Sequence, residues 1–515
     1  MREMNSKRER NSKLDYKRFL PTVIIIVIVL SIVVIYLEEV RLVVEHLYSI
    51  CAGTFGWIFI LANLCALLFS VWIILGPYKN IRIGGLNAKP EYSTFSWITM
   101  MFTTSCSAGL IVFGFIEPIY YAALNIPMHG EAYTVQTYEY AQMYAHYHWG
   151  INAWSLYVPA TIAIAYGIYN RNKNNVRMSL AYDATGNRNG GNIGSYMIDM
   201  VSLFGVVMAP TTSMGLGMPL LTGIIQEICG IPQQYEQIIQ ISILILWMAV
   251  FGTSVCLGIN KGIKNLSNIN AISAFVFMGI VGILAGAFYI FRAEINTVGM
   301  YIQNFVRMVT YTDPYGDGVF VQKWTIWYWA WLIVYMPLMG IFNARISKGR
   351  TLRQVALGQM IWCSLGCWIA MMTLGNYSIK LQMSGNLDIA SVLEGQGQAA
   401  AILEILKTMP YPKIMMAALG IICLIFMATT VDSSSFVAAE MTTKGNGIHT
   451  LASRSSRVIW AAVICAVTVV LLKVGGFDVV QVLAILTGLP LVFVMFIVII
   501  CTVRTLRKES NENTQ

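Results

Sequence analysis

Long apolar runs, separated by short polar segments, follow one another along nearly the whole chain. An α-helix needs about 20 predominantly apolar residues to cross the hydrocarbon core of a bilayer. Twelve runs meet this requirement, and we therefore predict an all-α integral membrane protein with twelve transmembrane helices. The runs lie at residues 20–36, 55–76, 94–122, 144–169, 195–221, 237–258, 271–292, 324–344, 355–376, 413–435, 457–473 and 478–503.

The polar segments between the runs alternate in charge. Lys and Arg gather before the first run, after every second run and after the last one, whereas the other segments carry acids such as Glu131 and Glu236. Cytoplasmic loops of membrane proteins are enriched in Lys and Arg. The pattern predicts a multi-pass protein of the cytoplasmic (inner) membrane with both termini in the cytoplasm. We expect a cytoplasmic N-terminal tail at 1–19, one membrane domain at 20–503 and a short cytoplasmic C-terminal tail at 504–515.

The composition agrees with this class of protein. Hydrophobic residues make up 57% of the chain and charged residues 11%, against about 25% charged in a soluble chain. The net charge of +9 comes from the short loops and does not indicate nucleic-acid binding; the partners that we expect are membrane lipid and a small molecule. The ten cysteines lack metal-type CxxC spacing, and no P-loop or nucleophile elbow is present. We therefore predict no metal ion, no cofactor and no enzymatic activity.

An aromatic stretch stands out in the eighth run, where residues 324–331 read Trp-Thr-Ile-Trp-Tyr-Trp-Ala-Trp. At about 100° per residue, one helix face carries Trp324, Trp327, Trp331, Tyr335 and Met339. Trp331 and Tyr335 lie about 10 and 17 Å deeper than Trp324, too deep for an aromatic belt at the membrane surface. Rings at this depth suit an organic cation such as trimethylammonium, which cation–π attraction holds. Ordinary core packing is the alternative.

Three runs contain polar and small residues at membrane depth, at 103–109, 210–219 and 429–435. Non-helical backbone is tolerated there only where it is buried in protein or lines a cavity. We interpret 103–109 and 429–435, together with Pro337, as breaks in helices around a central site, and 210–219 as close helix packing. Glu117 and Asp432 are either functional intramembrane charges or residues at helix ends.

Several motifs resemble the betaine/carnitine/choline transporter family. They are the aromatic stretch 324–331, Ala344-Arg-Ile-Ser-Lys-Gly-Arg-Thr351, His148-Trp149-Gly150, Phe115-Ile-Glu-Pro118, Lys261-Gly262 and Tyr311-Thr-Asp-Pro314. The resemblance covers nearly the whole chain. It implies a secondary transporter of quaternary-ammonium compounds that works by alternating access. It also implies a ten-helix inverted-repeat (5+5, leucine-transporter-type) core and assembly as a homotrimer.

Matching positions imply a substrate box made of Tyr120, Trp149, Trp331 and Tyr335, with Trp324 in an outer site on the entry path. Two positions depart from the family pattern. Leu332 stands where a second tryptophan is usual, and Lys323 stands where a small residue often precedes Trp324. The resemblance therefore leaves the substrate preference open among carnitine, γ-butyrobetaine, glycine betaine and choline.

The resemblance is closest to the carnitine/γ-butyrobetaine antiporter branch, and two residues bear on ion coupling. Lys264 matches an arginine that occupies a sodium position in sodium-independent antiporters, and Met339 replaces ligands of a second sodium ion. A fixed cation repels sodium, and a thioether is a poor ligand for it. We expect sodium-independent exchange. Thr429 and Thr430 keep hydroxyls that could bind sodium, so a sodium-coupled glycine betaine or choline importer for osmoprotection is the alternative.

Overall fold

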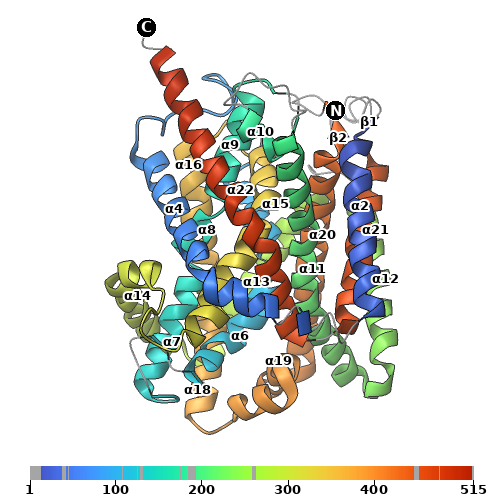
Figure 1. Cartoon of the computed structure of the whole chain (residues 1–515). Coiled ribbons are helices and arrows are strands. Elements are labelled where there is room, and N and C mark those ends of the chain that lie inside the picture. Colours follow the sequence, from blue (N-terminus) through green and yellow to red (C-terminus); the bar gives the residue numbers. More distant parts are fainter. Residues whose placement is uncertain are drawn as a thin grey trace.

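The computed structural model describes residues 13–36, 42–43, 46–106, 108–124, 126–127, 131–173, 175–183, 193–257, 262–445, 452–474 and 476–512. Nearly all of this chain is helical, and the long helices stand side by side in one bundle (Figure 1). Helix α2 (Tyr16–Ile35) begins, and helix α22 (Gly476–Glu512) ends, on the same face of the bundle, at the top of Figure 1.

The elements between these two helices follow in chain order. Those of the first half are η1 (Ser49–Thr54), α4 (Gly56–Leu75), α5 (Thr94–Ser105), α6 (Ala108–Ala122), α7 (Val135–His148), α8 (Ile151–Ser155), α9 (Val158–Tyr169), α10 (Ser179–Asp183), α11 (Ile193–Cys229), η2 (Gln233–Tyr235) and α12 (Glu236–Leu257). Those of the second half are α13 (Gly262–Ala285), α14 (Ala287–Thr310), η3 (Val321–Ile326), α15 (Trp327–Ile346), α16 (Leu352–Leu357), η4 (Gly358–Trp362), α17 (Cys363–Ala370), η5 (Met371–Gly375), α18 (Asn376–Met383), α19 (Ile389–Lys407), α20 (Pro412–Met441) and α21 (Arg454–Val474).

Each of the twelve predicted runs overlaps a helix or a series of joined helices. Within the described ranges, nine helices are long and apolar enough to cross a membrane, or ten if the bent pair α5 and α6 counts as one span. Helices α2 and α12 lie at the first and sixth predicted runs but are not among these nine. The all-α membrane class is thus confirmed, while the count of twelve spans stays a prediction.

The third run is broken, as the sequence predicts. Helix α5 ends at Ser105, and Cys106 adopts an extended conformation (φ −76°, ψ 104°). The axis of α6 is then bent by 69° from that of α5. Ser107 lies outside the described residues.

The prediction of a break at 429–435 is wrong, because α20 runs without interruption from Pro412 to Met441. Hydroxyl groups of this segment donate hydrogen bonds to backbone carbonyls of the same helix. Thr430 Oγ1 donates to the Phe426 carbonyl (3.0 Å), and Ser434 Oγ donates to the Thr430 carbonyl (2.8 Å). Such bonds to the preceding turn let a Ser- and Thr-rich segment stay helical. Asp432 is therefore buried inside α20 rather than at its end. Pro337 likewise does not interrupt α15.

The seventh run ends earlier than predicted. Helix α13 stops at Ala285, and Gly286 has a φ of +101°, a conformation that favours glycine. Residues 287–292, which we assigned to the span, instead begin α14, which packs against α7 and α4 at the flank of the bundle (Figure 1). The apolar pattern continues past Gly286 because one side of α14 carries exposed apolar residues such as Phe288 and Phe291.

The face on which α2 begins and α22 ends is held together by a short sheet and a buried ionic network. Strand β1 (Lys13–Leu14) pairs antiparallel with β2 (Thr443–Lys444), which follows α20. Asp15 accepts hydrogen bonds from Arg18 (2.9 Å) and Arg177 (2.8 Å), and Arg18 Nε also donates to Asp199 (2.7 Å). The segment that we expected to be a tail up to residue 19 thus contains the start of α2 and is anchored to three other parts of the chain.

Candidate substrate site

The aromatic residues of the eighth run form a connected series along one side of η3 and α15. Ring centroids are 5.8 Å apart for Trp324 and Trp327, 5.3 Å for Trp327 and Trp331, and 6.1 Å for Trp331 and Tyr335. Trp329 lies on another side of the helix, against Tyr147 at 5.3 Å. The helical spacing in the sequence therefore predicted which rings share a face.

Trp149 completes a box with the rings of α15. Its indole is perpendicular to that of Trp331 (6.0 Å, 90°) and meets the Tyr328 ring at 5.7 Å. The chain turns at this point because α7 ends at His148 and Gly150 is extended. A Cβ atom at Gly150 would come within 2.9 Å of the Tyr301 hydroxyl, so glycine allows the turn to pack closely against α14.

Two hydroxyl groups of α11 form hydrogen bonds with aromatic side chains of α15. Trp331 Nε1 donates to Thr212 Oγ1 (2.9 Å), and the Tyr335 hydroxyl forms a hydrogen bond with Ser213. Helix α11 is continuous through Pro210 and Pro219, as close packing would require. Close packing was nevertheless an incomplete interpretation of 210–219, because this segment also anchors the aromatic box. The sequence feature that could have indicated this role is the run of three hydroxyl residues, Thr211, Thr212 and Ser213, directly after Pro210.

Glu117 is the polar centre of the site. It lies inside α6 and not at its end, and its side chain is fully buried. Its carboxylate accepts hydrogen bonds from Tyr121 (2.5 Å), Tyr328 (2.5 Å) and Trp149 Nε1 (2.9 Å). A buried carboxylate is tolerated when several donors satisfy it. Glu117 therefore fixes the orientation of two rings of the box.

His148 extends this network. One ring nitrogen forms a hydrogen bond with the Tyr121 hydroxyl (2.7 Å) and the other with Thr325 Oγ1 (3.0 Å). The imidazole also stacks on Tyr328, with centroids 4.7 Å apart and an interplanar angle of 9°. His148 and Tyr328 were absent from the predicted site because their roles arise from contacts between α7, α6 and α15, which the sequence alone does not display.

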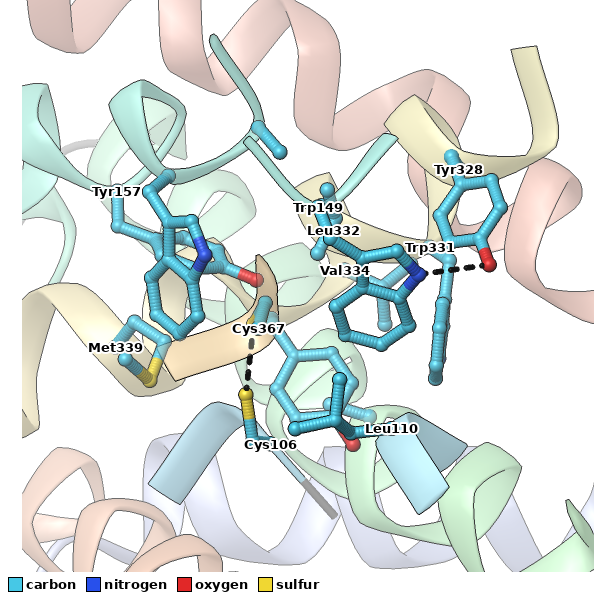
Figure 2. Close-up of a cluster of buried hydrophobic side chains, with 14 of the residues drawn as sticks. Cys106, Leu110, Trp149, Tyr157, Tyr328, Trp331, Leu332, Val334, Met339 and Cys367 are labelled. Carbon is cyan, nitrogen blue, oxygen red and sulfur yellow. Dashed lines mark hydrogen bonds between the residues drawn. The ribbon is translucent and has the colours of Figure 1, made fainter. Parts of the chain in front are cut away.

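Leu332 and Met339 are both buried on α15. Figure 2 draws them in one cluster of buried side chains with Trp149, Tyr328 and Trp331. The same cluster contains Cys106, at the break between α5 and α6, and Cys367 of α17, whose sulfur atoms are 3.5 Å apart. The broken helix thus lies directly beside the aromatic cluster.

Tyr120, which we expected in the box with Trp149, Trp331 and Tyr335, lies with Trp324, and their ring centroids are 5.5 Å apart. Tyr120 and Trp324 line a cavity of about 610 Å³, which we call the vestibule. The three other residues of the expected box do not line this cavity. Its wall is formed by Val112, Tyr120, Ala123, Leu124, Gly215, Leu216, Pro219, Leu220, Glu236, Gln240, Lys323, Trp324, Gln396, Gly397, Gln398, Ala399, Ile402, Leu471, Leu472 and Gln481.

Besides Met339 on α15, the residues that we expected to determine ion coupling lie on two helices that contact α5, namely α13 and α20. On α20, Thr429 Oγ1 donates to the Phe426 carbonyl (2.8 Å) and reaches the Thr103 carbonyl of α5 (3.4 Å). Thr430 follows it in the same buried stretch. The structure therefore places both threonines near the end of α5 that precedes the break.

Lys264 is partly buried in the first turn of α13. One turn later, Asn268 accepts a hydrogen bond from Thr99 of α5 (2.6 Å). Helices α5 and α13 run in the same direction, because Thr99 meets Asn268 and, further along both helices, Phe102 stacks on Phe275 with ring centroids 5.9 Å apart. Thr103 is four residues beyond Thr99, and Lys264 four residues before Asn268, so helical rise separates the backbones of Lys264 and Thr103 by about 12 Å along the bundle. No hydrogen bond joins Lys264 to either threonine within the described residues.

A family model described as BCCT, betaine/carnitine/choline family transporter, matches residues 18–511. The match covers the aromatic stretch, the Glu117 network and the helices that carry them. Members of this family are transporters and not enzymes. By this match over nearly its full length, the chain belongs to the betaine/carnitine/choline transporter family.

Proposed function

We propose that this protein exchanges quaternary-ammonium compounds of the carnitine, γ-butyrobetaine and betaine type across the cytoplasmic membrane, by sodium-independent antiport. The observation that carries the proposal is the perpendicular pair Trp149 and Trp331, completed by Tyr328 and Tyr335. A trimethylammonium group has no N–H to donate, so carbonyl oxygens do not select it. Ring faces attract it by about 0.5–2 kcal/mol each.

The rings are fixed before any substrate arrives. Both indole N–H groups already donate to buried acceptors, Trp149 to Glu117 and Trp331 to Thr212. A site whose side chains are held in place loses less conformational entropy when a ligand binds. Such preorganisation supports a substrate site.

The position of the broken helix supports alternating access. Helix α6 carries Glu117, which holds Trp149 of the α7 end and Tyr328 of α15. The break at Cys106 lets α6 change its angle to α5, and that movement would carry Glu117 with it. Broken helices beside a central site are typical of transporters that expose the site to each side in turn.

Two residues favour exchange without sodium. Met339 presents a buried thioether one turn beyond Tyr335 on α15, and sodium prefers oxygen ligands. Lys264 supplies a fixed positive charge on a helix that packs against α5. Without a driving ion, a transporter accumulates substrate against its gradient only by exchange for a second substrate on the opposite side.

A sodium-coupled importer of glycine betaine or choline is the second candidate. One observation favours it: the hydroxyl of Thr429 and the carbonyl of Thr103 are 3.4 Å apart at the end of α5, next to the buried Thr430. Hydroxyl and carbonyl oxygens are suitable ligands for a hard cation. The sodium dependence of transport separates the two candidates.

We extend the proposal to the assembly. We infer twelve transmembrane helices with a 5+5 inverted-repeat core, a homotrimer, and a cytoplasmic position for both termini. A helix at each of the twelve predicted runs supports the number of spans. The start of α2 and the end of α22, which share one face with Arg18 and Arg177, support the position of the termini. The inverted repeat and the homotrimer follow from the family resemblance alone.

Equilibrium binding to the purified protein tests the proposed substrate class. Labelled γ-butyrobetaine should be displaced by carnitine, glycine betaine and choline. It should not be displaced by 3,3-dimethyl-1-butanol, which has the shape of choline but carries no charge. Equal displacement by choline and by this uncharged alcohol would show that the rings recognise shape alone and would overturn the proposal.

A further inference from the structure

The vestibule combines aromatic faces with a positive charge. Trp324 and Tyr120 contribute the rings, whose centroids are 5.5 Å apart. Lys323, the residue before Trp324 in η3, contributes an exposed side chain. The cavity is also lined by part of α19, on the side of the bundle away from the chain ends (Figure 1).

The Lys323 side chain is available to a ligand. Its backbone is held because Gln481 Nε2 of α22 donates to the Lys323 carbonyl (3.0 Å). Its ammonium group makes no hydrogen bond or ion pair with any described residue, and Glu236, the acid of the same cavity, accepts instead from Gln240 (2.9 Å). The vestibule thus contains an ammonium group that forms no ion pair with any described residue, including Glu236 of the same cavity.

A second donor lies on α19. Gly397 interrupts this helix with a φ of +84°, so that three successive residues, Gln396 to Gln398, line the vestibule. A Cβ atom at Gly397 would meet nothing within 4 Å, so the backbone conformation and not lack of space favours glycine there. Gln398 Nε2 is buried and has no hydrogen-bond partner among the described residues. A buried donor without an acceptor is unfavourable, and a ligand oxygen would satisfy it.

These features match a molecule that carries a quaternary ammonium at one end and a carboxylate at the other. We propose that the vestibule selects zwitterionic betaines over choline, with Lys323 and Gln398 binding the carboxylate while Trp324 and Tyr120 hold the ammonium group. The proposal rests on the proposed function and assigns the selection to two side chains that contribute nothing to the central box. Choline has no carboxylate and so gains nothing from Lys323.

The size of the effect follows from the exposure of Lys323. Solvent weakens a charge-assisted hydrogen bond to an exposed ammonium group, so its effect on affinity is modest. The preference for carboxylated substrates that Lys323 provides should therefore be about 3- to 10-fold in apparent affinity, which corresponds to about 0.7–1.4 kcal/mol. The preference should decrease at high ionic strength because salt screens an exposed pair.

The test compares two competitors in one uptake assay. Proteoliposomes take up labelled γ-butyrobetaine, and the concentrations of unlabelled γ-butyrobetaine and of choline that halve the uptake are measured. Their ratio cancels any general loss of activity in a variant. In Lys323→Gln the ratio should shift about 3- to 10-fold against γ-butyrobetaine, Lys323→Arg should keep the wild-type ratio, and Gln398→Leu should shift it in the same direction as Lys323→Gln.

The matched control is Lys407→Gln on the same helix as Gln398. Lys407 is exposed and pairs with Glu404 (3.0 Å) and Glu227 (3.2 Å), outside the vestibule lining. This variant removes an equal charge and should keep the wild-type ratio. An unchanged ratio in Lys323→Gln, or an equal shift in Lys407→Gln, would overturn the role of Lys323. A wild-type protein that takes up no quaternary-ammonium compound would instead overturn the proposed function itself.

Discussion

The rings of the central box owe their positions to hydrogen bonds that their own heteroatoms make. Trp331 donates to Thr212 of α11, and Trp149 donates to Glu117 of α6. The rings of α15 could be predicted from the sequence because a single helix fixes their spacing. The sequence marked Glu117 as a candidate intramembrane charge, but the partners of Glu117 and Thr212 could not be predicted. They depend on how separate helices pack, which no periodicity within one helix reports.

At the residue scale, Trp331→Leu should abolish high-affinity binding of every quaternary-ammonium substrate. The substitution removes cation–π attraction of about 0.5–2 kcal/mol together with the packing of Trp149 and Trp327. Trp329→Leu is the matched control, since Trp329 lies on another side of α15, against Tyr147 and His148. Binding isotherms of the two purified variants check the prediction. Equal losses of affinity in both would mean that the aromatic series along η3 and α15 has only a structural role.

Leu332→Trp should change which betaine the protein prefers. Leu332 is 7% exposed, adjoins Trp331 and belongs to the buried cluster of Figure 2. An indole in place of the leucine side chain would narrow the site and add an aromatic face. The order of affinities for glycine betaine, carnitine and choline should therefore change. A competition panel measures this order. An unchanged order in a folded variant would place Leu332 outside the site.

At the scale of whole elements, the sequence predicted the positions of helices better than their continuity. The Thr- and Ser-rich segments at 103–109 and 429–435 look alike, yet only the first contains a break. In α20 the hydroxyls bond to carbonyls one turn earlier, as Thr430 does to Phe426. Composition does not distinguish a broken helix from a continuous one, because Ser and Thr hydroxyls can find hydrogen-bond acceptors in either conformation.

The broken helix provides a direct test of movement. Cys106 at the break and Cys367 of α17 have sulfur atoms 3.5 Å apart (Figure 2), so the oxidant diamide should join them in a disulfide while being reduced to a hydrazine. The bond would tie the break to α17 and should stop transport until dithiothreitol restores it. Loss of two hydrogens by mass spectrometry confirms the bond.

Two variants control this experiment. Cys367→Ala should transport normally and resist diamide, whereas Cys363→Ala, which removes another cysteine of α17, should remain sensitive. Full transport by a protein in which the Cys106–Cys367 bond has formed would show that the break does not move against α17.

At the scale of the whole molecule, Lys264 is the residue on which ion coupling depends most. Lys264→Gln removes a fixed charge from α13, and we expect it to lose transport in potassium and to regain part of it in sodium. Lys264 and Thr103 are separated by about 12 Å along the bundle. The Lys264 charge should therefore act through its electric field and through the packing of α5, without direct contact. Uptake in matched potassium and sodium buffers checks this. Wild-type behaviour in both buffers would make Lys264 an ordinary basic residue near the membrane surface.

The most direct test of sodium-independent exchange is the uptake of labelled γ-butyrobetaine into proteoliposomes that are either empty or loaded with carnitine. We predict uptake only into loaded vesicles, at equal rates in sodium and in potassium at matched ionic strength. Uptake into empty vesicles that requires an inward sodium gradient would contradict the account and establish the sodium-coupled importer in its place.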